Sequence, residues 1–63
     1  MTSGEKLRML RGQRSQQLIA DKLNISKSAY AMYERDERRP RDEIKERIAK
    51  LFGESVQSIF YAS

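Results

Sequence analysis

Residues 15–35 read SQQLIADKLNISKSAYAMYER, and the pattern in this stretch decides the fold. Its first half carries an apolar stripe at helical spacing, formed by Ile19, Ala20 and Leu23. Asn24 follows directly, and asparagine is one of the few residues besides glycine that tolerate the positive φ of a sharp helix exit. Ser15 and Ser26 can each cap a helix, because a serine hydroxyl accepts from an unpaired N–H at a helix start. The stretch therefore predicts two short helices, at about 15–23 and 26–35, joined by a very tight turn.

The second of these helices has two different faces. Tyr30, Tyr33 and Glu34 share one face at spacings i, i+3 and i+4, and we expect that face to pack inward. The opposite face mixes small, cationic and flexible side chains: Lys27, Ser28, Ala31, Met32 and Arg35. Two helices this close, with the small Ala20 where they cross, are typical of a helix-turn-helix.

The ordered residues of this motif resemble the Cro/CI-type (XRE) helix-turn-helix family of bacterial and phage transcriptional regulators. The positions that carry the resemblance are Gln16, Ile19-Ala20, Leu23, Ile25-Ser26, Tyr30, Tyr33-Glu34-Arg35 and Pro40. It extends over nearly the whole chain, from about Glu5 to Phe60. The resemblance implies an all-α fold, a lambda repressor-like DNA-binding domain, with residues 1–63 as one domain.

Three further short helices are predicted around the motif, which gives a compact bundle of five. We expect them at residues 5–11, at residues 41–52, and in a short segment that Ser55 caps. Their inward residues are Leu7 and Leu10, then Ile44, Ile48, Leu51 and Phe52, and last Val56, Ile59 and Phe60. Gly12 and Gly53 end the first and fourth helices.

Five positions depart from the family's pattern. Arg14 stands where relatives carry a leucine, so either the first helix ends early or the following turn is compressed. Asp36 stands where relatives usually have glycine, and aspartate can occupy a left-handed turn position at some cost. Glu54 replaces an aliphatic residue. Tyr30 and Tyr33 occupy positions that are mostly aliphatic in relatives. We expect these tyrosines to pack in the core, which is favoured over stacking on flipped bases.

Composition narrows the class of function. The 63 residues hold 13 Lys and Arg against 9 Asp and Glu, a net charge of +4 that indicates a polyanionic partner. No cysteine and no histidine are present, which argues against a zinc site, a disulfide and histidine catalysis. We therefore expect no enzyme, no cofactor, no metal and no small-molecule ligand. The absence of a membrane-spanning run or signal segment predicts a bacterial protein of the cytoplasm or nucleoid, without a membrane partner.

The outward face of the second motif helix is the expected base-reading surface. In a helix-turn-helix this face enters the major groove, where lysine can donate to guanine and apolar side chains contact thymine methyl groups. The residues expected to read bases are Lys27, Ser28, Ala31 and Met32. The alternative is that the face is merely exposed to solvent.

The resemblance also implies contacts that hold the DNA backbone and support the motif. Those expected to bind phosphates are Gln16, Arg14, Arg35, Arg38 and Arg39, with Arg41 beside them. A further implied pair, Arg11 with Glu34, would form a structural salt bridge beneath the DNA surface. The alternative for that pair is two separate surface ions.

These observations favour sequence-specific binding of double-stranded DNA by a small transcriptional regulator. A phage or mobile-element repressor, or a Cro-like protein, would act by occupying its operator. A homodimer on a two-fold symmetric operator is expected, with a dimer contact at Ile59, Phe60 and Tyr61, since little sequence remains to cover them. The alternative is a protein-binding module of the same fold, such as an antitoxin or anti-repressor. Convergence of the basic residues on one surface would favour DNA.

Overall fold

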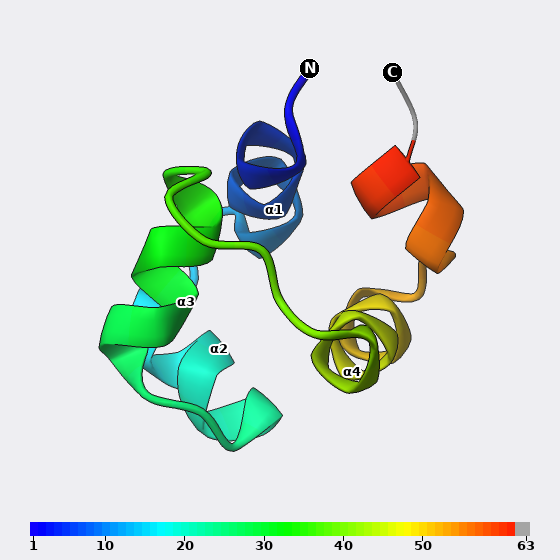
Figure 1. The fold of residues 1–63 in the computed structure, drawn as a ribbon. Helices are drawn as coiled ribbons and strands as arrows, with labels where there is room; N and C mark the ends of the chain where they lie inside the picture. Colours follow the sequence, from blue (N-terminus) through cyan, green and yellow to red (C-terminus); the bar gives the residue numbers. More distant parts are fainter. Residues whose placement is uncertain (62–63) are drawn as a thin grey trace.

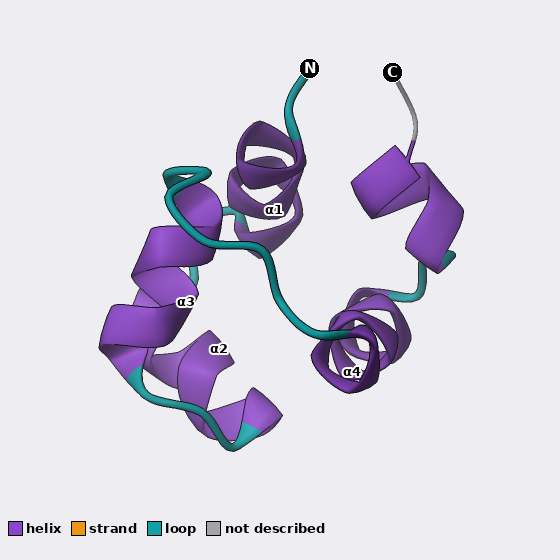
Figure 2. Ribbon diagram, in the orientation of Figure 1, coloured by secondary structure: helices purple, strands orange, loops and turns teal. Residues whose placement is uncertain are grey.

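The computed structural model describes residues 1–61, and all of its regular secondary structure is helical. Its elements are α1 (Ser3–Arg11), α2 (Gln16–Leu23), α3 (Lys27–Glu34), α4 (Asp42–Phe52) and η1 (Gln57–Tyr61). Loops join them, and the described residues contain no strand (Figure 2). The prediction of an all-α bundle that contains a helix-turn-helix is confirmed. No helix within residues 1–61 is both long and apolar enough to cross a membrane.

The first helix begins earlier than its predicted start at Glu5. Thr2 and Glu5 form a capping box, in which the Thr2 hydroxyl accepts from the Glu5 N–H at 3.1 Å. The Glu5 carboxylate in turn accepts from the Thr2 N–H at 2.8 Å. Because two otherwise unpaired N–H groups are bonded, the helix extends back to Ser3. Gly12 ends it with a φ of 62°, as the sequence predicts.

The tight turn between α2 and α3 has the predicted geometry. Asn24 adopts a left-handed conformation with a φ of 60°. The hydroxyls of Ser15 and Ser26 cap α2 and α3 by accepting from the N–H groups of Leu18 and Ala29. Serine hydroxyls therefore cap the start of both helices, and the left-handed Asn24 ends the first of them. The short turn between them fixes how they cross.

The last segment differs from its predicted form. It is a π-helical turn, η1, in place of a short α-helix. Ser55 still caps it, with its hydroxyl accepting from the Ser58 N–H at 3.0 Å. The η1 turn lies beside α1, while α2 and α3 form the other side of the bundle (Figure 1).

The predicted dimer contact at Ile59 and Phe60 is wrong, because both side chains are buried in the core. Ile59 and Phe60 are only 2% and 6% exposed, because η1 seats them among residues from the other helices. They are therefore covered by their own chain and are not available to a second copy. Tyr61, the third residue of that prediction, is 58% exposed. The largest side chains that are fully buried are Tyr30, Leu7, Ile19, Leu23 and Ile48.

Candidate nucleic-acid interface

The outer face of α3 and the start of α2 together border one open hollow. Lys27 and Ser28 stand exposed at the first turn of α3, and Arg35 stands exposed just after its end. Met32 is half-buried between them. The residues around the hollow are Gln16, Lys27, Ser28, Ala31, Met32 and Arg35. The structure thus brings the four residues predicted to read bases together with two of those predicted to bind phosphate.

Ala31 lies in this hollow differently from its neighbours. Only 9% of its surface is exposed, so it forms part of the floor and does not project outward. An apolar contact between Ala31 and a thymine methyl therefore requires the methyl to enter the hollow. Its short side chain leaves the space that the longer Lys27 and Met32 border.

Glu34 lies behind this face and contacts cationic and amide side chains from α1 and α2, with Arg8 the most distant of them at 4.0 Å. Its carboxylate accepts from Arg11 Nε at 2.6 Å and from Arg11 Nη2 at 3.0 Å, a bidentate ion pair. Gln16 Nε2 donates to the same carboxylate at 3.0 Å. The Glu34 side chain is 2% exposed, so these bonds replace the water that it lost on folding. The predicted pair of Arg11 with Glu34 thus exists beneath the surface and joins α1, α2 and α3.

The electrostatics of this cluster follow from burial and pairing. Burial by itself would raise the pKa of Glu34, but hydrogen bonds from Arg11 and Gln16 outweigh it and lower the pKa below its ordinary value. The carboxylate bond also raises the pKa of Arg11. Burial, aided by the neighbouring Glu34, raises the pKa of Tyr30. The Tyr30 hydroxyl is buried without a hydrogen-bond partner among the described residues.

The family resemblance predicts that Gln16 binds phosphate. The structure shows in addition a hydrogen bond from Gln16 to Glu34, which the sequence does not predict. One amide N–H of Gln16 donates to Glu34, which orients the amide at the edge of the hollow. Its remaining N–H and the backbone N–H groups at the start of α2 stay available to an anion. No sequence spacing signals this bond, because it depends on how α2 crosses α3.

Arg14 has a different position from the one expected. Its Nε and Nη2 donate to the carbonyls of Arg11 and Leu10 at 3.0 and 2.6 Å, which caps the end of α1. Its guanidinium lies 5.5 Å from the centre of the Phe52 ring. These contacts argue against a phosphate contact and show how the chain compensates for the missing leucine. Helix α1 ends at Arg11, and the turn after it is held by Arg14.

The remaining predicted cations lie on two neighbouring surfaces. Arg35 borders the hollow of α3 and pairs with Glu37 at 3.0 Å, with both side chains 55% exposed. That pairing raises the pKa of Arg35 and lowers the pKa of Glu37. Arg38 and Arg39 instead border a second hollow near Pro40, where Arg39 Nη2 donates to the Phe60 carbonyl at 3.5 Å. The basic residues therefore do not all lie on one surface. Lys27 and Arg35 border the hollow of α3, whereas Arg38 and Arg39 border the hollow near Pro40.

The end of α3 is also fastened to the start of α1. Asp36 has a φ of 58°, the predicted left-handed turn. Its carboxylate accepts from the Gly4 N–H at 2.9 Å and from the Thr2 hydroxyl at 2.7 Å. The two elements approach so closely that a Cβ on Gly4 would lie 2.2 Å from the Glu34 carbonyl oxygen. The T-x-x-E pattern of Thr2 and Glu5 is the sequence signal for this helix start.

The model of a helix-turn-helix family, HTH_3, matches residues 5–59, a range that includes most of α1, the turn between α2 and α3, and α4. No curated protein and no solved structure gives a significant match.

Proposed function

Because the chain belongs to the HTH_3 helix-turn-helix family of Cro/CI (XRE) type, whose domains bind double-stranded DNA, we propose that it is a sequence-specific repressor that acts by occupying its operator. The observation that carries the proposal is the hollow formed by Gln16 and the outer face of α3. Cations, a hydroxyl and a thioether border it, and this mixture suits base edges and phosphates. A phage or mobile-element repressor, or a Cro-like protein of the bacterial cytoplasm, fits this chemistry.

In the proposed complex α3 lies in the major groove, which is about 12 Å wide. Lys27 donates to guanine, Ser28 donates or accepts, and Met32 contacts a thymine methyl. The start of α2 holds a phosphate through its unpaired N–H groups and Gln16. Arg35, Arg38 and Arg39 hold phosphates on either side, which sets the position of α3 but carries little sequence information.

One such module covers few base pairs, so the proposal includes a homodimer on a two-fold symmetric operator. Two recognition helices about 34 Å apart would occupy successive major grooves on one side of the duplex. The net charge of +4 would assist the encounter with DNA through its long-range field.

The test is the salt dependence of binding to duplex DNA. If the dimer neutralises roughly six to ten phosphates, the logarithm of the binding constant falls against the logarithm of the salt concentration with a slope of about −5 to −9. Binding is measured by fluorescence anisotropy on a duplex and on a single strand of the same sequence. A slope near zero on the duplex, or equal affinity for the single strand, would contradict the proposal.

A further inference from the structure

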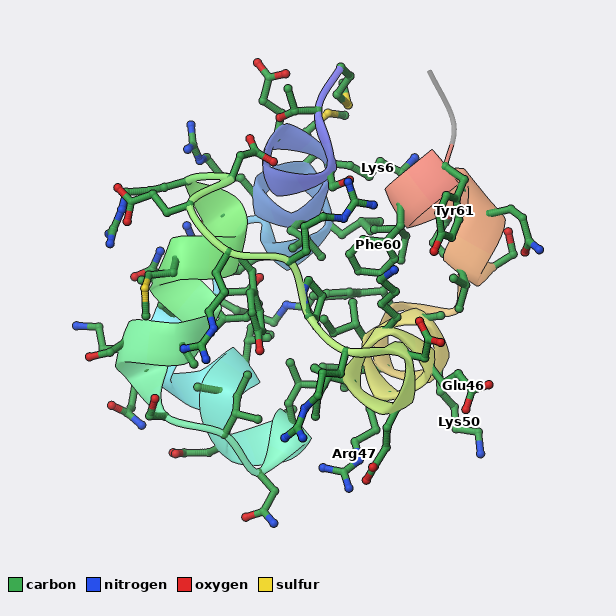
Figure 3. The ribbon with its side chains drawn as sticks, in the orientation of Figure 1. Lys6, Glu46, Arg47, Lys50, Phe60 and Tyr61 are labelled. Atoms are coloured by element: carbon green, nitrogen blue, oxygen red, sulfur yellow. The ribbon has the colours of Figure 1, made fainter. Side chains whose placement is uncertain are left out.

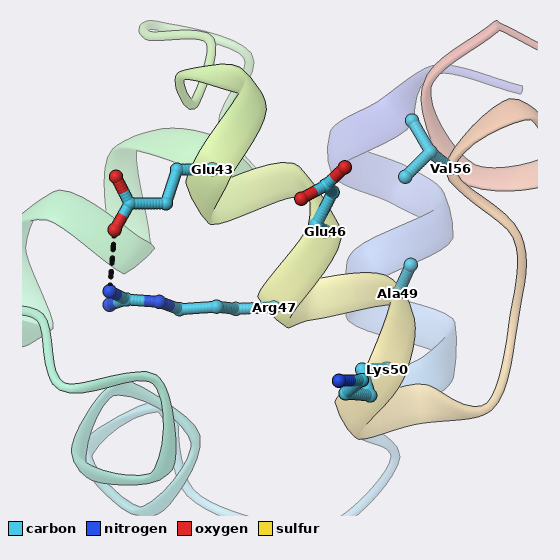
Figure 4. Close-up of a pocket in the computed structure, with 6 residues that line it drawn as sticks. All are labelled: Glu43, Glu46, Arg47, Ala49, Lys50 and Val56. Carbon is cyan, nitrogen blue, oxygen red and sulfur yellow. Dashed lines mark hydrogen bonds and ion pairs between the residues drawn. The ribbon is translucent and has the colours of Figure 1, made fainter.

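The outer face of α4 is a second charged surface, separate from the DNA-binding face. Glu43, Glu46, Arg47 and Lys50 come from successive turns of this helix, and together with Ala49 and Val56 they border an open hollow (Figure 4). Glu43 and Arg47 satisfy each other through an ion pair of 2.7 Å. The proposed DNA contacts use none of these residues.

Glu46 and Lys50 are the two charges on this face that lack a partner. Neither side chain makes a hydrogen bond or an ion pair within residues 1–61, and both are exposed. Both point away from the bundle on the same side (Figure 3). An adjoining hollow also includes Glu46 and Val56 and extends to Tyr61, which is 58% exposed. The surface therefore combines two unpaired charges with apolar side chains.

The order of these charges makes the face complementary to itself. Glu46 and Lys50 are separated by one turn of α4, roughly 6 Å along its axis. When two α4 helices lie antiparallel about a two-fold axis near residue 48, Glu46 of each copy faces Lys50 of the other. A parallel arrangement would instead bring like charges together. Ala49, beside these charges, is only 6% exposed, so it presents no bulky side chain that would hold the two helices apart.

We propose that the α4 face is a self-association surface whose occupant is a second copy of this chain. Two Glu46–Lys50 pairs would flank a contact between the half-buried Val56 side chains of the two copies. This inference rests on the homodimer in the proposed function, and it places the contact away from the buried Ile59 and Phe60. Because exposed ion pairs contribute little, the association is weak and depends on salt.

The test is a charge exchange in the full chain, followed by sedimentation equilibrium up to about millimolar protein. The proposed dimer contains two Glu46–Lys50 pairs. Either single variant, Glu46→Lys or Lys50→Glu, replaces both pairs with two side chains of like charge. Each should weaken self-association roughly tenfold. The double variant, Glu46→Lys with Lys50→Glu, restores both pairs in reverse and should return to wild-type association. Lys22→Glu, an exposed charge reversal on α2, is the matched control and should leave association unchanged.

Three results would overturn this assignment: a wild type that stays monomeric over the whole concentration range, single variants that associate like the wild type, or a double variant no better than the singles. Circular dichroism spectra confirm that each variant is folded. Duplex binding by the wild type is measured separately. A wild type that binds duplex DNA but does not self-associate would overturn only the α4 surface, whereas a wild type that does not bind duplex DNA would contradict the proposed function.

Discussion

At the scale of single residues, the buried carboxylate of Glu34 decides how the motif is held. It is fixed by Arg11 from α1 and Gln16 from α2, so one charge coordinates three helices. The two members of the ion pair are not equally buried, since the side chains of Arg11 and Glu34 are 18% and 2% exposed. Arg11 also donates to the Arg14 carbonyl at 2.8 Å and so keeps a partner when Glu34 is removed.

Removal of either charge should therefore destabilise the protein, and Arg11→Ala should do so more than Glu34→Ala. Arg11→Ala leaves the buried carboxylate with only the Gln16 hydrogen bond and the more distant Arg8, whose Nε is 4.0 Å away. We therefore expect a loss of about 3 kcal/mol in the free energy of unfolding, the lower end of the range for a broken buried pair. The double variant Arg11→Met with Glu34→Leu should recover much of this loss, because no charge is left unpaired. Urea denaturation of the three variants measures the effect. Single variants that each lose less than about 1 kcal/mol would show that the pair behaves as exposed ions.

The residue scale also shows where sequence reasoning reached its limit. The pair of Arg11 with Glu34 was expected from the family resemblance and is present. The Gln16 bond to Glu34 and the turning of Arg14 onto Phe52 were not expected. Both depend on side-chain rotamers at a crossing between helices, and a linear pattern does not encode them.

At the scale of elements, the contact between the start of α1 and the end of α3 positions the recognition helix. Asp36 bonds both Thr2 and Gly4, and Gly4 admits the Glu34 carbonyl at a distance that no side chain would permit. The start of α1 is thus tied to the helix that is proposed to read DNA. A change in α1 can therefore alter DNA binding without touching DNA.

Gly4→Ala tests this contact, because it should reverse the usual effect of alanine in a helix. In an open helix the change would stabilise by about 1 kcal/mol. Here the added Cβ would lie 2.2 Å from a backbone oxygen, so we expect a loss of about 1–3 kcal/mol. Met9→Ala, on the exposed side of the same helix, should change stability by less than about 0.5 kcal/mol. Stabilisation by Gly4→Ala in urea denaturation would mean that α1 and α3 do not approach this closely.

The predicted elements match the structure best where capping and apolar spacing agree. Helices α2 and α4 begin within a residue of their predicted positions, and Asn24 and Gly53 end them as expected. The early start of α1 was missed, although the capping-box pattern is present in the sequence. The π-helical form of η1 is predicted by no residue pattern in this segment, although its apolar Ile59 and Phe60 were correctly expected to face inward.

At the scale of the whole molecule, the chain separates two surfaces with different chemistry. Around α3 the cations accompany a hydroxyl and a thioether, whereas the α4 face carries acids and bases in an order that suits its own copy. The fold thereby leaves the recognition helix free while a different helix can join two copies. The buried cluster of Glu34 lies between α1, α2 and α3 and supports the first of these surfaces.

The central claim is that the outer face of α3 reads the sequence of duplex DNA, and selection from a random duplex pool tests it most directly. The wild type should enrich one motif, with two half-sites related by two-fold symmetry. Lys27→Ala should bind the selected site about 1–3 kcal/mol more weakly and relax the preference at one base pair of each half-site. A pool without any enriched sequence, or an unchanged motif selected by Lys27→Ala, would contradict the claim.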